Sequence, residues 1–315
     1  MVQTGNQVPS FERAAELFET YTATRACEAT VRRYTERAGM AMLEEARSGE
    51  GAAGPPEPPK LWASVDGANV PLVGGGWAEV RTLVIGEVHE GPESEPRCSN
   101  MSYFSRLATA EDFMDLVEPE VRRRGLDRAR EVGFGSDGAT WCQRFPERWC
   151  PEAVRGLDFW HAAGYVHDFS KVLWPATEGN QQWWAQGMLH DLKHHGPWRL
   201  LRSLAGWAAI GGRGKLGKAA VGTLGYFEVR EELLDYPSLR AAGWPIGTGA
   251  VESANKLVVE ERMKGTGMHW GEAHVNPMLA LRNAQCSRRW DQEWAATAAR
   301  LTRERTPALS IHAKT

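Results

Sequence analysis

The spacing of apolar and polar residues predicts five β-strands. Residues 61–67, 78–88 and 102–107 form three apolar runs, and their short connections favour antiparallel neighbours. Residues 131–138 form a fourth strand, and residues 154–161 form a short fifth strand that runs into a helix. The first and fourth strands each finish on an Asp-Gly pair, which places Asp66 and Asp137 at strand ends.

Helical spacing dominates the rest of the chain. Residues 110–124 form an amphipathic helix, and the stretch from 162 to about 245 is rich in Trp, Leu and Ala without a convincing strand. Another helix begins after the Gly/Pro-rich turn at 244–247, with Thr248 as its N-cap, and stops at Gly265. This order of elements predicts an α/β protein of the α+β kind, with a mixed sheet flanked by helices.

The first 50 residues predict a separate helical segment. Two helices, at 11–18 and 29–39, are joined by a short polar turn, and Arg32 and Arg33 lie near the start of the second. The pattern fits a DNA-binding helix-turn-helix and, equally well, an ordinary helical hairpin. We expect a helical segment at 1–50, a Pro/Gly-rich linker at 51–60, a main domain at 61–290 with a helical insertion at about 162–245, and a C-terminal helix and tail at 291–315.

Composition and charge indicate a globular protein of the cytosol. Of the 315 residues, 42% are hydrophobic and 24% are charged, and no apolar run reaches the ~20 residues that a membrane span needs. The N-terminus has no apolar signal region, and the five cysteines form no CxxC pair, which argues against disulfides and structural zinc. The net charge is only −3, but residues 192–227 carry six Lys or Arg and no acid, as in a phosphate-binding surface or a solvated helical face.

Three carboxylates are candidates for a metal site. Asp66 and Asp137 each follow an apolar strand and precede a glycine, so a ligand can reach them closely. Glu252 lies in the first turns of the helix after Thr248, which is a rigid support. Mg²⁺ prefers oxygen ligands, and a pair of such ions suits phosphodiester chemistry. Each acid also has a simpler interpretation: an Asp-Gly turn for the aspartates, and an ion pair with Lys256 for Glu252.

Four segments of the sequence resemble a bacterial DDE transposase. They are VDG at 65–67, SDGATW at 136–141, LDFWH at 157–161, and GTGAVESANK at 247–256 followed by RMKGTGMHW at 262–270. Together they are most similar to the IS-Kra group of insertion-sequence transposases, which is related in plan to the Mutator and hAT types. The similarity spans about residues 10–290, and its last segment is the longest and most specific.

The resemblance implies an RNase-H-like core with a helical insertion between the second Asp and the Glu. Its acidic triad falls on Asp66, Asp137 and Glu252, and its Asp/Cys-x-x-His element falls on Asp158 and His161. It implies two Mg²⁺ or Mn²⁺ ions, with Asp66 bridging both ions and the other two acids each completing one site. The implied activity is cleavage of transposon ends and strand transfer into target DNA. The alternative is a non-catalytic DNA-binding remnant.

Further expectations concern DNA. The candidate DNA-binding residues are Lys256, Arg262, Lys264 and Trp270 around the Glu252 helix, and Arg32 and Arg33 in the N-terminal segment. His161 either positions the scissile phosphate or a base, or pairs with Asp158 in the core. Synapsis of two DNA ends implies a homo-oligomer without membrane contact, in the bacterial cytoplasm at the nucleoid. Relatives usually carry a longer N-terminal region, so recognition of the transposon ends is expected to be incomplete.

Overall fold

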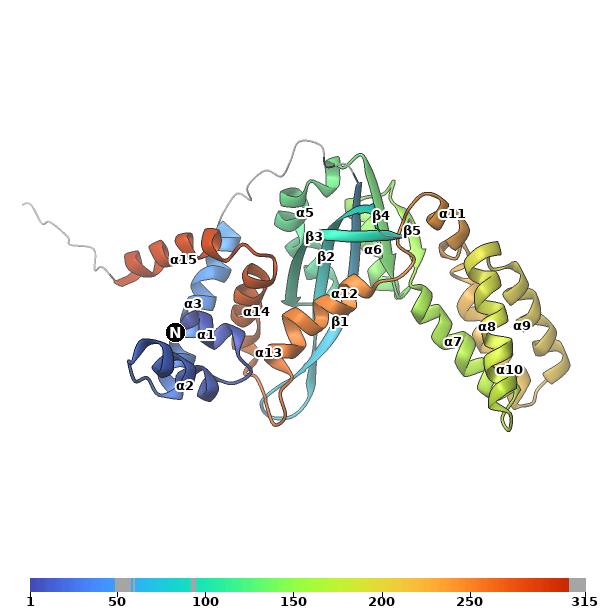
Figure 1. The fold of residues 1–315 in the computed structure, drawn as a ribbon, viewed down its shortest axis with the longest axis horizontal. Helices are drawn as coiled ribbons and strands as arrows, with labels where there is room; N and C mark the ends of the chain where they lie inside the picture. Colours follow the sequence, from blue (N-terminus) through green and yellow to red (C-terminus); the bar gives the residue numbers. More distant parts are fainter. Residues whose placement is uncertain (49–57, 59, 92–94, 306–315) are drawn as a thin grey trace, which may run out of the picture.

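The computed structural model describes residues 1–48, 58, 60–91 and 95–305 (Figure 1). The predicted linker lies outside these residues except for Pro58 and Lys60, and Lys60 already belongs to the first strand. The described part of the chain is elongated, with a central sheet and a group of helices at each end.

A five-stranded mixed sheet, in the order β3-β2-β1-β4-β5, forms the centre of the molecule. Its strands are β1 (Lys60–Pro71), β2 (Trp77–Glu90), β3 (Pro96–Leu107), β4 (Glu131–Ser136) and β5 (Val154–Leu157). The first three strands pair antiparallel, whereas β4 lies parallel to β1 and β5 lies parallel to β4. The predicted mixed sheet and its antiparallel first half are confirmed.

The helices form three groups around the sheet and one helix that crosses it (Figure 1). One face is covered by α4 (Ala110–Leu116), α5 (Glu118–Arg124) and α6 (Thr140–Trp149). Beyond β5 lie α7 (Phe159–Leu173), α8 (Glu178–His195), α9 (Trp198–Gly211), α10 (Lys215–Glu228) and α11 (Tyr236–Ala241). The opposite end holds α1 (Val2–Gln7), α2 (Phe11–Thr22), α3 (Glu28–Ser48), α14 (Glu272–Cys286) and α15 (Trp290–Arg305). The crossing helix consists of α12 (Gly249–Ala254), a π-helical segment (Asn255–Glu260) and α13 (Glu261–Met263), and short 3₁₀ turns occur at Leu126–Arg128 and Glu231–Leu233.

Alternation along β1 explains how the two faces of the sheet are covered. Leu61 and Val65 pack in the same core as Phe113 of α4. Trp62 faces the other side, where its ring centroid lies 6.1 Å from that of Trp244. Successive side chains of a strand point to opposite faces, so Asp66 lies on the same face as Trp62.

Several predicted boundaries differ in the structure, and two of them have a clear physical reason. β1 continues to Pro71, so Asp66 lies inside a strand and not at its end, because β1 and β2 stay paired beyond the point where β4 stops. The helix predicted at 110–124 is two helices, with Pro119 in the first turn of α5. Proline lacks the backbone N–H that a continuous helix requires, but it fits the first turn of a new helix.

The N-terminal helices share a hydrophobic core with the main domain. Arg262 donates from Nε to the carbonyl oxygen of Gly5 (3.0 Å) and from Nη1 to that of Pro9 (3.1 Å). Helix α3 lies so close to α14 that a Cβ on Gly39 would stand 2.5 Å from the carbonyl oxygen of Pro277. The two predicted helices of this segment are present as α2 and α3, and α1 was not predicted. The boundary expected near residue 50 therefore divides one continuous core.

Helix α14 covers the free edge of β3 with amide side chains. Asn283 accepts a hydrogen bond from the backbone N–H of Ser105 (3.1 Å) and donates to the carbonyl oxygen of the same residue (3.2 Å). Asn276 makes the same pair of bonds with Leu107, at 2.8 and 3.0 Å. These bonds satisfy backbone groups that an edge strand otherwise leaves unpaired.

Candidate active site

Parallel pairing of β1 with β4 brings two carboxylates together. The register pairs Ser64 with Gly135, and continuing it by two residues on each strand sets Asp66 beside Asp137. β4 ends at Ser136, so Asp137 stands in the loop that leaves the strand, whereas Asp66 stays paired with Thr82 of β2. Both aspartates therefore lie just beyond the point where β1 and β4 stop pairing.

Helix α10 of the helical insertion holds the Asp137 loop. Asp137 Oδ1 accepts a hydrogen bond from the backbone N–H of Ala139 (2.8 Å), and the Tyr226 hydroxyl donates to the carbonyl oxygen of Asp137 (3.3 Å). Arg230 donates from Nε and Nη2 to the carbonyl oxygen of Gly138, at 3.2 and 3.1 Å. Gly138 has a φ of 80°, and a Cβ there would lie 2.5 Å from Arg230 Nε. Glycine is therefore needed for both conformation and space.

Helix α12 brings Glu252 to the same region. Val251 and Ala254 pack against Val84 of β2 and leave the intervening Glu252 exposed. The simpler interpretation of Glu252 does not hold, because no ion pair joins it to Lys256 in the described structure and both side chains are exposed. Its carboxylate is thus left available at the surface above the sheet.

The helix that carries Glu252 changes its winding directly after that residue. Asn255 begins the π-helical segment, and its Nδ2 donates to Asp66 Oδ2 at 2.8 Å. Val258 and Val259 of the same segment remain buried. A single π-helical turn inside an α-helix is rare and is often found at functional sites. Here it allows one helix to contact Asp66 and to keep its apolar face in the core.

The three carboxylates interact electrostatically. Burial raises the pKa of Asp66 from 3.8 to about 6, and the neighbouring charges of Asp137 and Glu252 add to the increase. Hydrogen bonds from the backbone N–H of Gly67 (2.7 Å) and from Asn255 act in the opposite direction. A nearby cation would therefore favour the ionised form of Asp66.

Four residues of this site were missed in the sequence: Asn255, Cys142, Tyr226 and Arg230. Asn255 lies three residues after Glu252 on the same side of the helix, so a signal for it was present. The Cys142 thiol lies 3.6 Å from Asp137 Oδ1, and burial followed by the Asp137 charge raises its pKa. The bond from Tyr226 to Asp137 spans 89 residues of chain, so no local pattern could indicate it.

The carboxylate oxygens are suitable ligands for a hard divalent cation. Asp137 keeps one carboxylate oxygen, and Glu252 keeps both, without a hydrogen bond from any described residue. Across the described ranges, no three His, Cys, Asp or Glu side chains are grouped so that they could already hold a metal ion. A divalent cation between the three acids would nevertheless relieve the repulsion felt by Asp66, so this donor set fits Mg²⁺.

Asp158 is a buried link between two helices. It is 1% exposed, and its Oδ1 accepts a hydrogen bond from the backbone N–H of His161 (2.5 Å) at the start of α7. Its Oδ2 accepts from both the backbone N–H and the hydroxyl of Thr248. Thr248 thus begins α12 without capping it through its side chain, because its hydroxyl is bound to Asp158. The prediction of a side-chain N-cap is wrong.

The His161 side chain does not pair with Asp158. Its ring is exposed and lies 5.6 Å from the ring of Tyr165 and 6.2 Å from the ring of Tyr226, measured between centroids. Tyr226 is the residue that holds the Asp137 loop. His161 therefore lies on the same side of the site as the insertion, open to solvent.

The predicted DNA contacts divide into exposed and buried side chains. Lys256, Arg32 and Arg33 are exposed, and Lys264 is half-buried and paired with Glu260 at 2.7 Å. Arg262 is 1% exposed and Trp270 is 5% exposed. Both pack against Phe11 of α2. Direct contact with DNA is not available to Arg262 or Trp270 in this structure.

Neither a scan of protein-family models nor a search of curated proteins gives a match to this chain. None of the helices in the described residues combines the length and apolar character that crossing a membrane requires. Function is therefore inferred from the geometry of the carboxylates and from the sequence resemblance.

Asp66 should make the stability of the protein depend on pH and on metal. Its folded-state pKa of about 6 lies above 3.8, so between these values the folded protein holds a proton that the unfolded chain releases. Binding of this proton stabilises the folded protein. The contribution is complete below about pH 4, and the free energy of unfolding falls by roughly 2–3 kcal/mol as the pH rises through 6. We expect Mg²⁺ or Mn²⁺ to raise Tm more above pH 6 than below it, where the proton competes. In Asp66→Asn the metal-dependent shift should disappear, and an unchanged shift in thermal unfolding would contradict this account.

Proposed function

We propose that this protein is a DDE-type DNA transposase with an RNase-H-like catalytic core. The mixed sheet supports this, because three antiparallel strands are followed by two parallel strands in the order β3-β2-β1-β4-β5. The order of the acids along the chain also agrees with the plan that the resemblance implies. Asp66 lies on β1, Asp137 follows β4, and Glu252 comes after the helices α7 to α11.

The convergence of the three acids is the observation that carries the proposal. The β1–β4 register sets Asp66 beside Asp137, and the hydrogen bond from Asn255 joins the Glu252 helix to Asp66. The raised pKa of Asp66 reflects burial together with the charges of the other two acids. Carboxylates brought together from distant parts of a chain are costly unless a cation balances them, and this favours a metal site over three unrelated turns.

Each residue has a role that follows from its position. Asp66, oriented by Gly67 and Asn255, would hold the Mg²⁺ or Mn²⁺ ions together with Asp137 and Glu252. Such ions activate an attacking oxygen and stabilise a leaving oxygen at phosphorus. The chain itself supplies orientation, because strand pairing and two hydrogen bonds hold the Asp66 carboxylate in a fixed position.

Exposed side chains around the acids suit a DNA strand. Lys256 follows Glu252 by one helical turn and has no ion pair with any described residue, so it is free to contact a backbone phosphate. Trp160 is 70% exposed, and its ring lies against the turn before α12, 3.2 Å from a Cβ built on Gly247. An exposed indole at this place offers a stacking surface for a base. The proposed partners are double-stranded DNA and further copies of the chain that hold two DNA ends together, in the bacterial cytoplasm.

The test is a cleavage assay on DNA taken from the flanks of the coding sequence, where the terminal repeats lie. Purified protein should cut at the repeat boundary with Mg²⁺ or Mn²⁺, and should join the cut 3′ ends to a target plasmid. Chelated metal and a scrambled repeat serve as matched controls. Binding to the repeats without metal-dependent cleavage would contradict the proposal and favour the DNA-binding remnant.

A further inference from the structure

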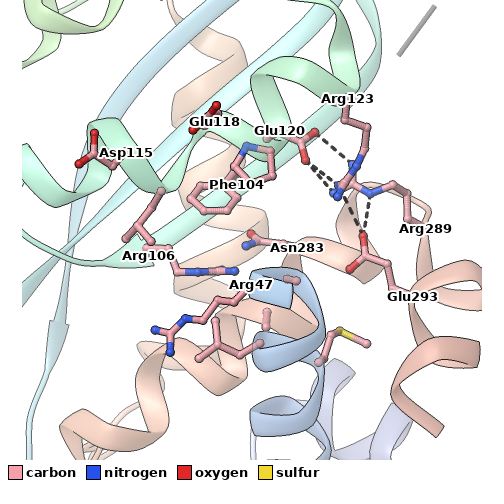
Figure 2. Close-up of a pocket in the computed structure, with 16 residues that line it drawn as sticks. Arg47, Phe104, Arg106, Asp115, Glu118, Glu120, Arg123, Asn283, Arg289 and Glu293 are labelled. Carbon is pink, nitrogen blue, oxygen red and sulfur yellow. Dashed lines mark hydrogen bonds and ion pairs between the residues drawn. The ribbon is translucent and has the colours of Figure 1, made fainter. Parts of the chain in front are cut away.

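A pocket lies between β3 and the helices packed against it (Figure 2). Its volume is about 250 Å³, and it shares no lining residue with the carboxylate site. Side chains from β3, α3, α4, α5, α14 and α15 form its walls. Four arginines and four acids are among them: Arg47, Arg106, Arg123, Arg289, Asp115, Glu118, Glu120 and Glu293.

Two of these arginines and two of the acids neutralise each other. Glu120 is almost completely buried and pairs with Arg289 at 3.0 Å and with Arg123 at 2.9 Å. Glu293 pairs with Arg289 at 2.8 Å. Figure 2 shows this network as the group joined by dashed lines. It leaves neither glutamate free to pair with another cation.

The other two acids are paired with arginines that do not line the pocket. Asp115 pairs with Arg148 at 2.5 Å, and Glu118 pairs with Arg122 at 2.5 Å. No acid in the described structure therefore forms an ion pair with Arg47 or Arg106. The pocket holds two positive charges in excess of its own ion pairs.

Arg106 is the unusual member of this pair because it is 6% exposed. Its Nη1 donates to the carbonyl oxygen of Ser105 (2.8 Å), and its guanidinium lies 4.5 Å from the ring centroid of Phe104. Its Nε and Nη2 have no hydrogen-bond partner among the described residues. Burial lowers its pKa to about 10, with Glu293 opposing this and Arg47 adding to it, so it stays charged at neutral pH. An anion in the pocket would supply the counter-charge that no described acid gives Arg106 through an ion pair.

We propose that this pocket binds a phosphate monoester between the guanidinium groups of Arg47 and Arg106. Figure 2 shows both groups on the same side of the pocket, apart from the Glu120 network. A guanidinium presents paired N–H donors that match two oxygens of one phosphate, so Arg106 can use Nε and Nη2 together. The apolar side chains of Met42 and Leu43 leave space for a small organic part of the ligand.

The ligand has two possible sources with the same chemistry. A phosphate monoester can belong to a small metabolite or to the 5′ end of a nucleic acid. Calorimetric titrations at constant ionic strength should use inorganic phosphate, a nucleoside 5′-monophosphate, and matched oligonucleotides with a 5′-phosphate or a 5′-hydroxyl. Saturable binding of phosphate and of the nucleotide is expected. Tighter binding of the 5′-phosphate oligonucleotide than of its 5′-hydroxyl form identifies a nucleic-acid end, and equal binding identifies a metabolite.

Two variants and a matched control decide whether the pocket is responsible. Arg47→Gln changes an exposed side chain and should weaken phosphate binding about tenfold, and Arg106→Lys keeps the charge but removes the fork, with a similar loss. Arg13→Gln removes an exposed arginine of α2 that pairs with Glu16, and neither residue lines the pocket, so this variant should bind phosphate like the wild type. No saturable binding of any phosphate probe, or wild-type affinity in Arg47→Gln, would overturn the proposal. Because Arg47 is exposed, this result does not depend on whether Arg106→Lys folds.

Discussion

Asp66→Asn, Asp137→Asn and Glu252→Gln should each reduce metal-dependent DNA cleavage by at least about 10³-fold. Each change nearly keeps the volume of the side chain and removes one negative charge from this group of three acids, whose charges act on one another through Asp66. Two metal ions together contribute several kcal/mol to stabilising the transition state, and loss of one ligand charge removes a large part of this. Single-turnover cleavage rates at saturating metal measure the effect.

Two exposed acids provide matched controls. Asp127→Asn changes an exposed acid that pairs with neighbouring Arg128 at 3.2 Å, and Glu272→Gln changes an exposed acid at the start of α14. Both should cleave at the wild-type rate. If one of the three candidate acids can be neutralised without loss of rate, that residue does not belong to the catalytic group.

Asp158→Ala should lower the free energy of unfolding by about 3 kcal/mol or more. The change removes the acceptor for the backbone N–H of His161 and for the N–H and hydroxyl of Thr248, and leaves these donors unpaired in the interior. Because this carboxylate joins the start of α7 to the start of α12, Glu252 would also be held less firmly. Urea unfolding and cleavage should therefore be affected together.

The same helix offers the control for Asp158. Asp168 of α7 is exposed and pairs with Lys171 at 2.7 Å, so Asp168→Ala should change stability by less than about 0.5 kcal/mol. Asp158→Asn keeps one carbonyl acceptor and should be intermediate. Loss of cleavage in Asp158→Ala with unchanged stability would instead assign it the catalytic role that the sequence resemblance implies.

Local sequence patterns were sufficient for the strands that carry the first two acids. Alternation has a period of two residues, so β1 and β4 could be recognised without knowledge of their partners. The end of β1 was misjudged at Gly67, although Ala68 and Val70 continue the alternation on one face. A glycine after an apolar run predicts the end of a strand, but Gly67 continues to pair with Arg81 of β2.

Contacts between distant parts of the chain could not be predicted from these patterns. Arg262 is a basic residue near the Glu252 helix, so the sequence predicts a DNA contact. In the structure it is instead buried, and it donates a hydrogen bond to the carbonyl oxygen of Gly5, which lies 257 residues away in the chain. The same limit applies to Asp158, whose bond to Thr248 spans 90 residues and turns a candidate catalytic acid into a buried link. A sequence motif indicates which side chains lie near one another. Whether a side chain such as Arg262 is exposed or buried depends on which other helices of the chain pack against it.

Three polar side chains on α14 and at its C-terminal end restrict how two copies of the protein can associate. Ser287 accepts a hydrogen bond from the backbone N–H of Tyr103 (3.0 Å). Asn283 and Asn276 accept hydrogen bonds from the backbone N–H groups of Ser105 and Leu107. A strand from a second protomer would need these same backbone groups to extend the sheet. This stretch of β3 is therefore closed to strand addition, and under the proposed function two protomers on two DNA ends would meet through other surfaces or through the DNA itself.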